Sequence, residues 1–145
     1  MSIYKRSPKK AIKPRTNREH DLQVACVRWF RFSYPKYREL LWAIPNGAVL
    51  KKGGHEWGKL KAEGAMAGVA DLFLMLPSGE YHGLFIEMKT DKGKQQPSQK
   101  DFEQNAIAYD YAYAMPRSTM EFEQVVRNYI EYGEYEKPRI DKTAE

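Results

Sequence analysis

The chain has 145 residues, the usual size of one domain, and its hydrophobic content of 42% is enough to bury a core. Its 24 Lys and Arg residues against 19 Asp and Glu residues give a formal net charge of +5 at pH 7. No run approaches the roughly 18 apolar residues of a membrane span, and the basic N-terminus lacks the apolar segment of a secretory signal. We therefore expect one cytoplasmic domain.

The positive charge is concentrated at the N-terminus. Seven basic residues and no acidic residue lie within residues 1–18: Lys5, Arg6, Lys9, Lys10, Lys13, Arg15 and Arg18. Without these seven, 17 basic residues stand against 19 acidic ones, a balance of −2. We expect this segment to be a disordered tail, which either adds salt-sensitive affinity for phosphate backbones, through residues such as Arg15 and Arg18, or only aids solubility.

Apolar residues spaced three and four apart predict a first helix from about Thr16 to Ser33. Thr16 and Glu19 have the spacing of a capping box, and Glu19 shares one helical face with Gln23. Glu19 therefore either caps the helix or reaches an active site, and the pattern favours neither. Cys26 lies in the apolar stripe and, as the single cysteine, is expected to be a buried thiol.

Short elements are expected next along the chain. Residues 40–44 predict a buried strand that ends at Pro45-Asn46-Gly47. Lys51 and Lys52 precede two glycines, so this stretch either lets a phosphate backbone approach closely or forms a plain surface loop. Residues 57–63 are weakly helical in pattern.

The centre of the chain predicts an antiparallel hairpin. Its two apolar strands span about residues 71–76 and 84–89, and its turn is centred on Ser78-Gly79. Loop length largely fixes the register of a hairpin, so Asp71 is expected to face Glu87 to within about one residue.

Side chains alternate along a strand, so Glu87 and Lys89 are expected on one face and Met88 on the other. Two carboxylates and an ammonium then meet at one end of an apolar hairpin, an arrangement that costs several kcal/mol unless the charges are paired or hold a metal. Asp71 and Glu87 suit Mg²⁺ or Mn²⁺, and Glu19 adds a third carboxylate if its helix packs nearby. Such a group with a lysine describes a metal-dependent nuclease.

The last third of the chain predicts a helix over residues 97–109, a strand over 111–115 and a final helix over 118–130 that opens with a capping box. Residues from about 133 onward are expected to be frayed. Both faces of the hairpin are apolar, so helices should cover the sheet on both sides. The expected fold class is α/β, with a mixed central sheet of about four strands flanked by helices.

In combination, these residues resemble the PD-(D/E)XK nucleases and, more narrowly, the VRR-NUC family of virus-type replication-repair nucleases. The matching segments, in chain order, are Glu19 with Gln23, Pro45-Asn46-Gly47, Glu63-Gly64, Gly68-Val69-Ala70-Asp71, Glu87-Met88-Lys89 and Ser98-Gln99. One departure is Ala70, where the family pattern usually has a proline that supplies no ligand. A chain this short resembles the stand-alone members found in phages and bacteria.

The resemblance implies a restriction-endonuclease-like core over residues 19–132, between the tail of residues 1–18 and a flexible C-terminal tail of residues 133–145. It implies that Mg²⁺ or Mn²⁺ is bound by three carboxylates, that a lysine is catalytic and that a glutamine assists. The corresponding residues here are Glu19, Asp71 and Glu87 for the metal, Lys89 for the lysine and Gln99 for the glutamine.

Stand-alone members are similar to Holliday junction resolvases, which implies a homodimer that cuts branched or four-way junction DNA in a bacterial or phage-infected cell. Two alternatives stay open. One is a nuclease of the same fold without branch preference, of the nicking or restriction type. The other is a non-catalytic DNA-binding accessory protein.

Overall fold

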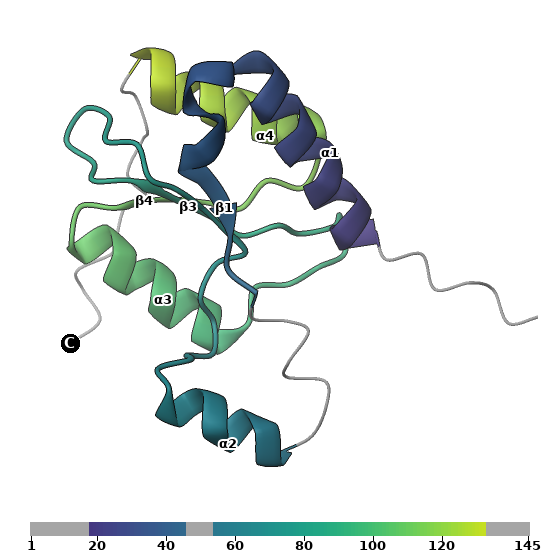
Figure 1. Ribbon diagram of the computed structural model, residues 1–145, viewed down its shortest axis with the longest axis vertical. Coiled ribbons are helices and arrows are strands. Elements are labelled where there is room, and N and C mark those ends of the chain that lie inside the picture. Colours follow the sequence, from purple (N-terminus) through teal and green to yellow (C-terminus); the bar gives the residue numbers. More distant parts are fainter. Residues whose placement is uncertain (1–17, 46–53, 133–145) are drawn as a thin grey trace, which may run out of the picture.

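Four short strands form one mixed sheet in the order β1-β2-β3-β4 (Figure 1). The computed structural model describes residues 18–45 and 54–132. The strands are β1 (Leu41–Ala43), β2 (Leu72–Leu74), β3 (Leu84–Ile86) and β4 (Ala112–Ala114). The β1–β2 and β2–β3 pairs are antiparallel, and β4 runs parallel to β3. This topology confirms the expected α/β class with a mixed four-stranded sheet.

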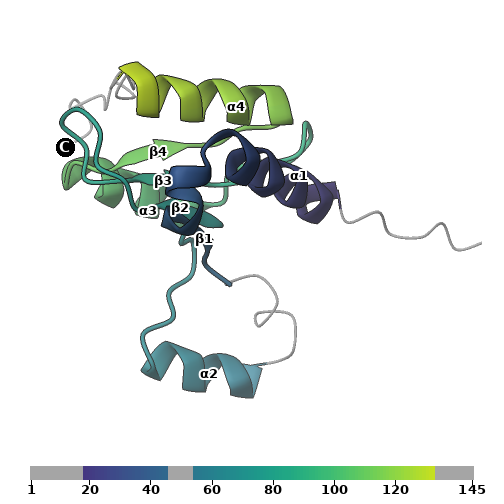
Figure 2. The same cartoon turned by 45° about the horizontal axis from the view of Figure 1, so that its top comes forward.

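Helices cover both faces of the sheet, as the apolar hairpin predicted (Figures 1 and 2). The α-helices are α1 (Arg18–Ser33), α2 (Gly54–Ala62), α3 (Pro97–Ala108) and α4 (Thr119–Arg127). Helices α1 and α4 pack together on one face, and α3 packs on the other. Among the described residues, none of the helices is long and apolar enough to cross a membrane.

The face under α1 and α4 is aliphatic at the sheet. Leu72 and Leu74 of β2 and Leu84 and Ile86 of β3 have no solvent exposure. They share one apolar core with side chains from the two helices, namely Cys26, Phe30, Phe122 and Val126. Alternation along the strands sends these four residues to the same side, as the period of two requires.

The face under α3 is aromatic. Phe73 and Phe85 are cross-strand partners with ring centroids 4.5 Å apart, and Phe102 of α3 meets Phe85 edge to face at 4.9 Å. Tyr111 and Trp42 extend this layer toward the two sheet edges. The two faces therefore differ in chemistry but are both apolar, which explains why each needs a helix.

The hairpin register agrees with the prediction. Leu72 pairs with Ile86, so the next pair outward is Asp71 with Glu87. The tip lies one residue later than expected, because Ser78 pairs with Tyr81 and leaves Gly79 and Glu80 in the turn. The ladder is interrupted between β2 and this turn, so the regular strands are shorter than the predicted 71–76 and 84–89.

The secondary structure of two segments, residues 35–40 and 128–132, differs from the sequence prediction. A 3-10 helix, η1 (Pro35–Leu40), follows α1 and contains Leu40, which was expected to begin a strand. The final helix changes to a π-helical turn, η2 (Asn128–Tyr132), where the Tyr129 hydroxyl donates to the Leu76 carbonyl at 2.7 Å. That bond ties the end of the chain's last helix to the hairpin.

Several sequence predictions fall outside the described residues. They concern the proposed cap at Thr16, the turn at Asn46-Gly47, the basic pair Lys51-Lys52 and both tails, of which only Arg18 is described.

The packing predicts that two phenylalanines of α1 differ sharply in their contribution to stability. Phe30 is fully buried and Phe32 is 87% exposed. Phe30→Ala is expected to lower the free energy of unfolding by about 3–5 kcal/mol, whereas Phe32→Ala should change it by less than about 0.5 kcal/mol. Urea denaturation of both variants measures this, and equal losses would contradict the packing described.

Candidate active site

Asp71 stands at the entry to β2, where the chain passes directly against the start of α3. Gly68 makes this approach possible, because a β-carbon there would overlap the backbone carbonyl of Ser98, and its φ is +87°. The Asp71 Oδ2 atom accepts a hydrogen bond from the Met88 backbone N–H at 2.7 Å. The carboxylate is thereby fixed across the hairpin from Glu87.

Glu87 and Lys89 follow β3 and are both buried, at 3% and 8% exposure. The Lys89 Nζ atom lies 3.1 Å from Glu87 Oε1, and the Gln99 side-chain amide donates to the same oxygen at 2.5 Å. Met88 points into the core on the opposite side of the strand. The predicted alternation is confirmed, and the residues after β3 direct one carboxylate and one ammonium toward α3.

Gln99 is held in place by the start of α3. The helix begins at Pro97 with Gln96 as its N-cap, and the Gln96 backbone N–H donates to Gln99 Oε1 at 2.8 Å. That bond uses the amide oxygen, so the amide nitrogen is left to donate to Glu87. The capping arrangement therefore fixes which end of the glutamine faces the carboxylate.

Burial dominates the electrostatics of this cluster. It raises the pKa of Glu87 from 4.5 to about 7, and the Asp71 charge adds to the effect while Lys89 opposes it. Burial also raises the pKa of Asp71, against the Met88 hydrogen bond and the Lys89 charge. One ammonium therefore does not fully compensate two buried carboxylates.

Glu19 comes to the same end of the sheet from the first turn of α1. Its charge raises the pKa of both Asp71 and Glu87. Its Oε1 atom lies 3.5 Å from where a β-carbon on Gly93 would stand, next to the Lys89 side chain. The first helix and the hairpin end thus meet in space.

The arrangement fits a hard divalent cation in its donor chemistry. Glu87 Oε2 is buried and has no hydrogen-bond partner within residues 18–45 and 54–132. An unpaired buried carboxylate oxygen beside a second carboxylate suits Mg²⁺ or Mn²⁺. Over the same residues, no three His, Cys, Asp or Glu side chains are gathered closely enough to hold an ion, so Glu19 as a third ligand stays a prediction.

Two residues near the site were missed by sequence reasoning. Arg117 donates from Nη1 to the carbonyls of Thr90 (2.7 Å) and Gly93 (2.8 Å), and so holds the turn after Lys89. Tyr113 is the β4 partner of Phe85, and its pKa is raised by burial and then by the Glu87 charge. Had the parallel pairing of β4 with β3 been predicted from the sequence, it would have placed Tyr113 beside the site. No sequence pattern indicates the contacts of Arg117.

The residues expected to touch nucleic acid are mostly beyond the described part of the chain, namely Arg15, Lys51 and Lys52. Arg18 is exposed at the start of α1. It lines a hollow of about 220 Å³ together with Thr90, Lys92 and Arg117. Arg18 is therefore close to the turn that follows Lys89, whereas the other three predicted DNA-contacting residues are not described.

Comparison with known proteins identifies a family and a related fold. The model of the VRR-NUC domain family matches residues 6–118. A solved structure described as a VRR_NUC domain protein superposes with a TM-score of 0.67 over 77% of this chain and 87% of that one, at 24% identity, which indicates a shared fold. No curated protein matches the chain.

The raised pKa of Glu87 predicts the pH dependence of stability in metal-free protein. Because the folded state holds this proton more tightly than the unfolded chain, stability is full below the unfolded pKa of 4.5 and is lost as pH rises through about 7. The loss is expected to reach about 3 kcal/mol. Urea unfolding in EDTA at several pH values measures it; Glu87→Gln should flatten the curve, and the same slope in both proteins would contradict the assignment.

Proposed function

The chain belongs to the VRR-NUC domain family, and we propose that it is a metal-dependent endonuclease that hydrolyses phosphodiester bonds in branched DNA such as a four-way junction. The observation that carries this proposal is the buried Glu87 carboxylate, shared by Lys89 and Gln99 and opposite Asp71. Ionisable groups that burial perturbs in this way are characteristic of active sites.

Asp71 and Glu87, with Glu19 alongside, are the residues that would hold Mg²⁺ or Mn²⁺. When bound, such an ion polarises a phosphodiester and lowers the pKa of a coordinated water. The oxygen-only donor set supports a hard cation over zinc. The orphaned Glu87 Oε2 atom supports the same choice.

Lys89 is proposed to stabilise the negative charge that develops on the phosphate. Lys89 is 8% exposed and its Nζ atom lies 3.1 Å from Glu87 Oε1, so its position is set before DNA arrives. A charge fixed in a site of low dielectric needs little reorganisation during the reaction. Gln99 acts as a positioning residue, because its side-chain amide donates to the Glu87 oxygen that also pairs with Lys89.

Preference for branched DNA and a homodimeric state are the finer parts of the proposal. They are supported by the resemblance to stand-alone family members and by symmetry. Two active sites related by a two-fold axis can cut both strands of a symmetric junction in one encounter, whereas one site cannot.

The central test is cleavage of a labelled four-way junction, a flap and a plain duplex with Mg²⁺ or Mn²⁺. Junction cleavage is expected in wild type, and Lys89→Ala should lower its rate by about 10²- to 10³-fold. Lys100→Ala is the matched control, since Lys100 is exposed on α3 next to Gln99.

Absence of metal-dependent cleavage, or an unchanged rate in Lys89→Ala, would overturn the catalytic proposal. Equal cutting of junction and duplex would leave a nuclease without branch preference. Binding without cleavage, unaffected by Glu87→Gln, would indicate an accessory protein.

A second prediction concerns the basic N-terminal segment. Deleting residues 1–15 removes six basic residues and should lower the dependence of log affinity on log salt by up to about five units, because each lost phosphate contact removes about 0.9. Fluorescence anisotropy at several salt concentrations measures the slope, with the thermal midpoint Tm as the control for folding. An unchanged slope would show that this segment does not contact phosphates.

A further inference from the structure

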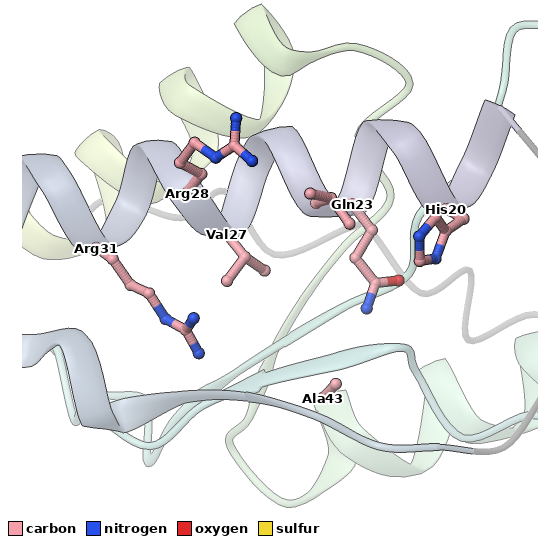
Figure 3. A pocket seen from close by; sticks show the side chains of 7 residues that line it. His20, Gln23, Val27, Arg28, Arg31 and Ala43 are labelled. Atoms are coloured by element: carbon pink, nitrogen blue, oxygen red, sulfur yellow. The ribbon is translucent and has the colours of Figure 1, made fainter.

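A groove outside the carboxylate cluster lies between α1 and β1, with a volume of about 440 Å³ (Figure 3). Its sides carry donors, namely His20, Gln23, Arg28 and Arg31, and its apolar part comes from Val24, Val27 and Ala43. None of these side chains belongs to the site described above.

Helical spacing explains why the lining residues gather on one face of α1. Residues 20, 24, 27 and 31 follow the spacing of four, three and four that forms a stripe along a helix. Figure 3 shows the Gln23 and Arg31 side chains extending from α1 toward β1, whereas the Arg28 side chain extends from α1 away from β1. The core residues Cys26 and Phe30 lie on a different face of the helix.

One end of the groove adjoins Glu19 along α1. His20 follows Glu19 in sequence, and Gln23 lies one turn further along the same helix. Arg31 is eleven residues beyond His20, which at 1.5 Å per residue is about 16 Å. A nucleic acid strand that advances about 3.4 Å per step along the helix axis would pass about five nucleotides over this length.

The charge of the groove suits a polyanion. Within the part of the chain that the structure describes, neither Arg28 nor Arg31 has an ion-pair partner. Guanidinium groups bind phosphates through paired N–H donors, and Gln23 adds an amide donor closer to the cluster. Val24, which is 42% exposed, and Val27 offer apolar surface suited to sugars and bases.

We propose that this α1–β1 groove binds the backbone of the DNA strand being cut, over several nucleotides to one side of the scissile phosphate. The inference rests on the proposed function, since DNA is the polyanion that must reach the neighbouring cluster. Arg31 and Gln23 contact phosphates here, and the groove sets the direction in which the strand leaves the site.

The first test measures affinity for a fluorescein-labelled four-way junction in EDTA, where no cleavage intervenes. The double variant Arg28→Gln/Arg31→Gln is expected to bind at least about fivefold more weakly and to lower the salt slope by about two. Arg127→Gln, which removes one positive charge where the double variant removes two, is the control outside the groove. Arg127 lies over the Trp29 ring, and Trp29 is two residues from Val27 and so faces away from the groove. Equal affinity and slope in the double variant and wild type would overturn the proposal.

A second test locates the DNA without changing charge. Cys26 is fully buried, and burial raises the pKa of its thiol to about 11, so wild type should react slowly with maleimide. Val24→Cys in the groove is expected to label fast, and saturating junction DNA should slow it at least about fivefold. Tyr109→Cys is the control, because Tyr109 is 74% exposed and lies at the opposite end of α3 from Gln99. DNA should not change the labelling rate of this variant.

Labelling of Val24→Cys that DNA does not slow would show that the strand takes another path. Slow labelling even without DNA would show that something else fills the groove, and would also overturn the proposal. Both tests read binding, whereas the proposed function is read by metal-dependent cleavage. Failure of the groove proposal is therefore distinguishable from failure of the proposed nuclease function.

Discussion

The burial of the Glu87 carboxylate is the constraint on which this site depends. A charged group at 3% exposure is costly unless it has partners, and Lys89 and Gln99 supply them on a single oxygen. To supply them, β3 must continue straight past Ile86 and α3 must begin beside it. The absence of a β-carbon at Gly68, which lets the chain lie against Ser98, and the N-cap at Gln96 are the local features that allow α3 to begin there.

The pairing of β2 with β3 and the helices on both faces bring the other residues to the same end of these strands. Asp71 precedes β2 and Glu87 follows β3, so antiparallel pairing brings the two carboxylates to one end of the hairpin. Helix α1 on the aliphatic face contributes Glu19 from its first turn, and α3 on the aromatic face contributes Gln99 from its own.

Much of this was predictable because it follows from short-range rules. Alternation along a strand separated Met88 from Glu87 and Lys89, and loop length set Asp71 opposite Glu87 even though the turn lies one residue later. Pro97 marked the start of α3 and so placed Gln99 in its first turn.

The remainder depends on packing between distant segments. Arg117 reaches the carbonyls of Thr90 and Gly93 across more than twenty residues of sequence, and no local pattern encodes that contact. Tyr113 became a neighbour of the site only through the parallel pairing of β4 with β3. The α1–β1 groove likewise needs the relative position of a helix and a strand, although its arginines are visible in the sequence.

The most direct test of the account is a titration of metal-free protein with Mn²⁺, followed by electron paramagnetic resonance, in wild type and Glu87→Gln. The substitution keeps the size and hydrogen-bonding shape of the side chain but removes the charge. The account predicts that wild type binds Mn²⁺ and that Glu87→Gln binds it at least about tenfold more weakly, because loss of a direct ligand should cost no less than loss of an outer-shell partner of a ligand. Equal affinity in the two proteins would contradict the assignment of this buried carboxylate as the metal site.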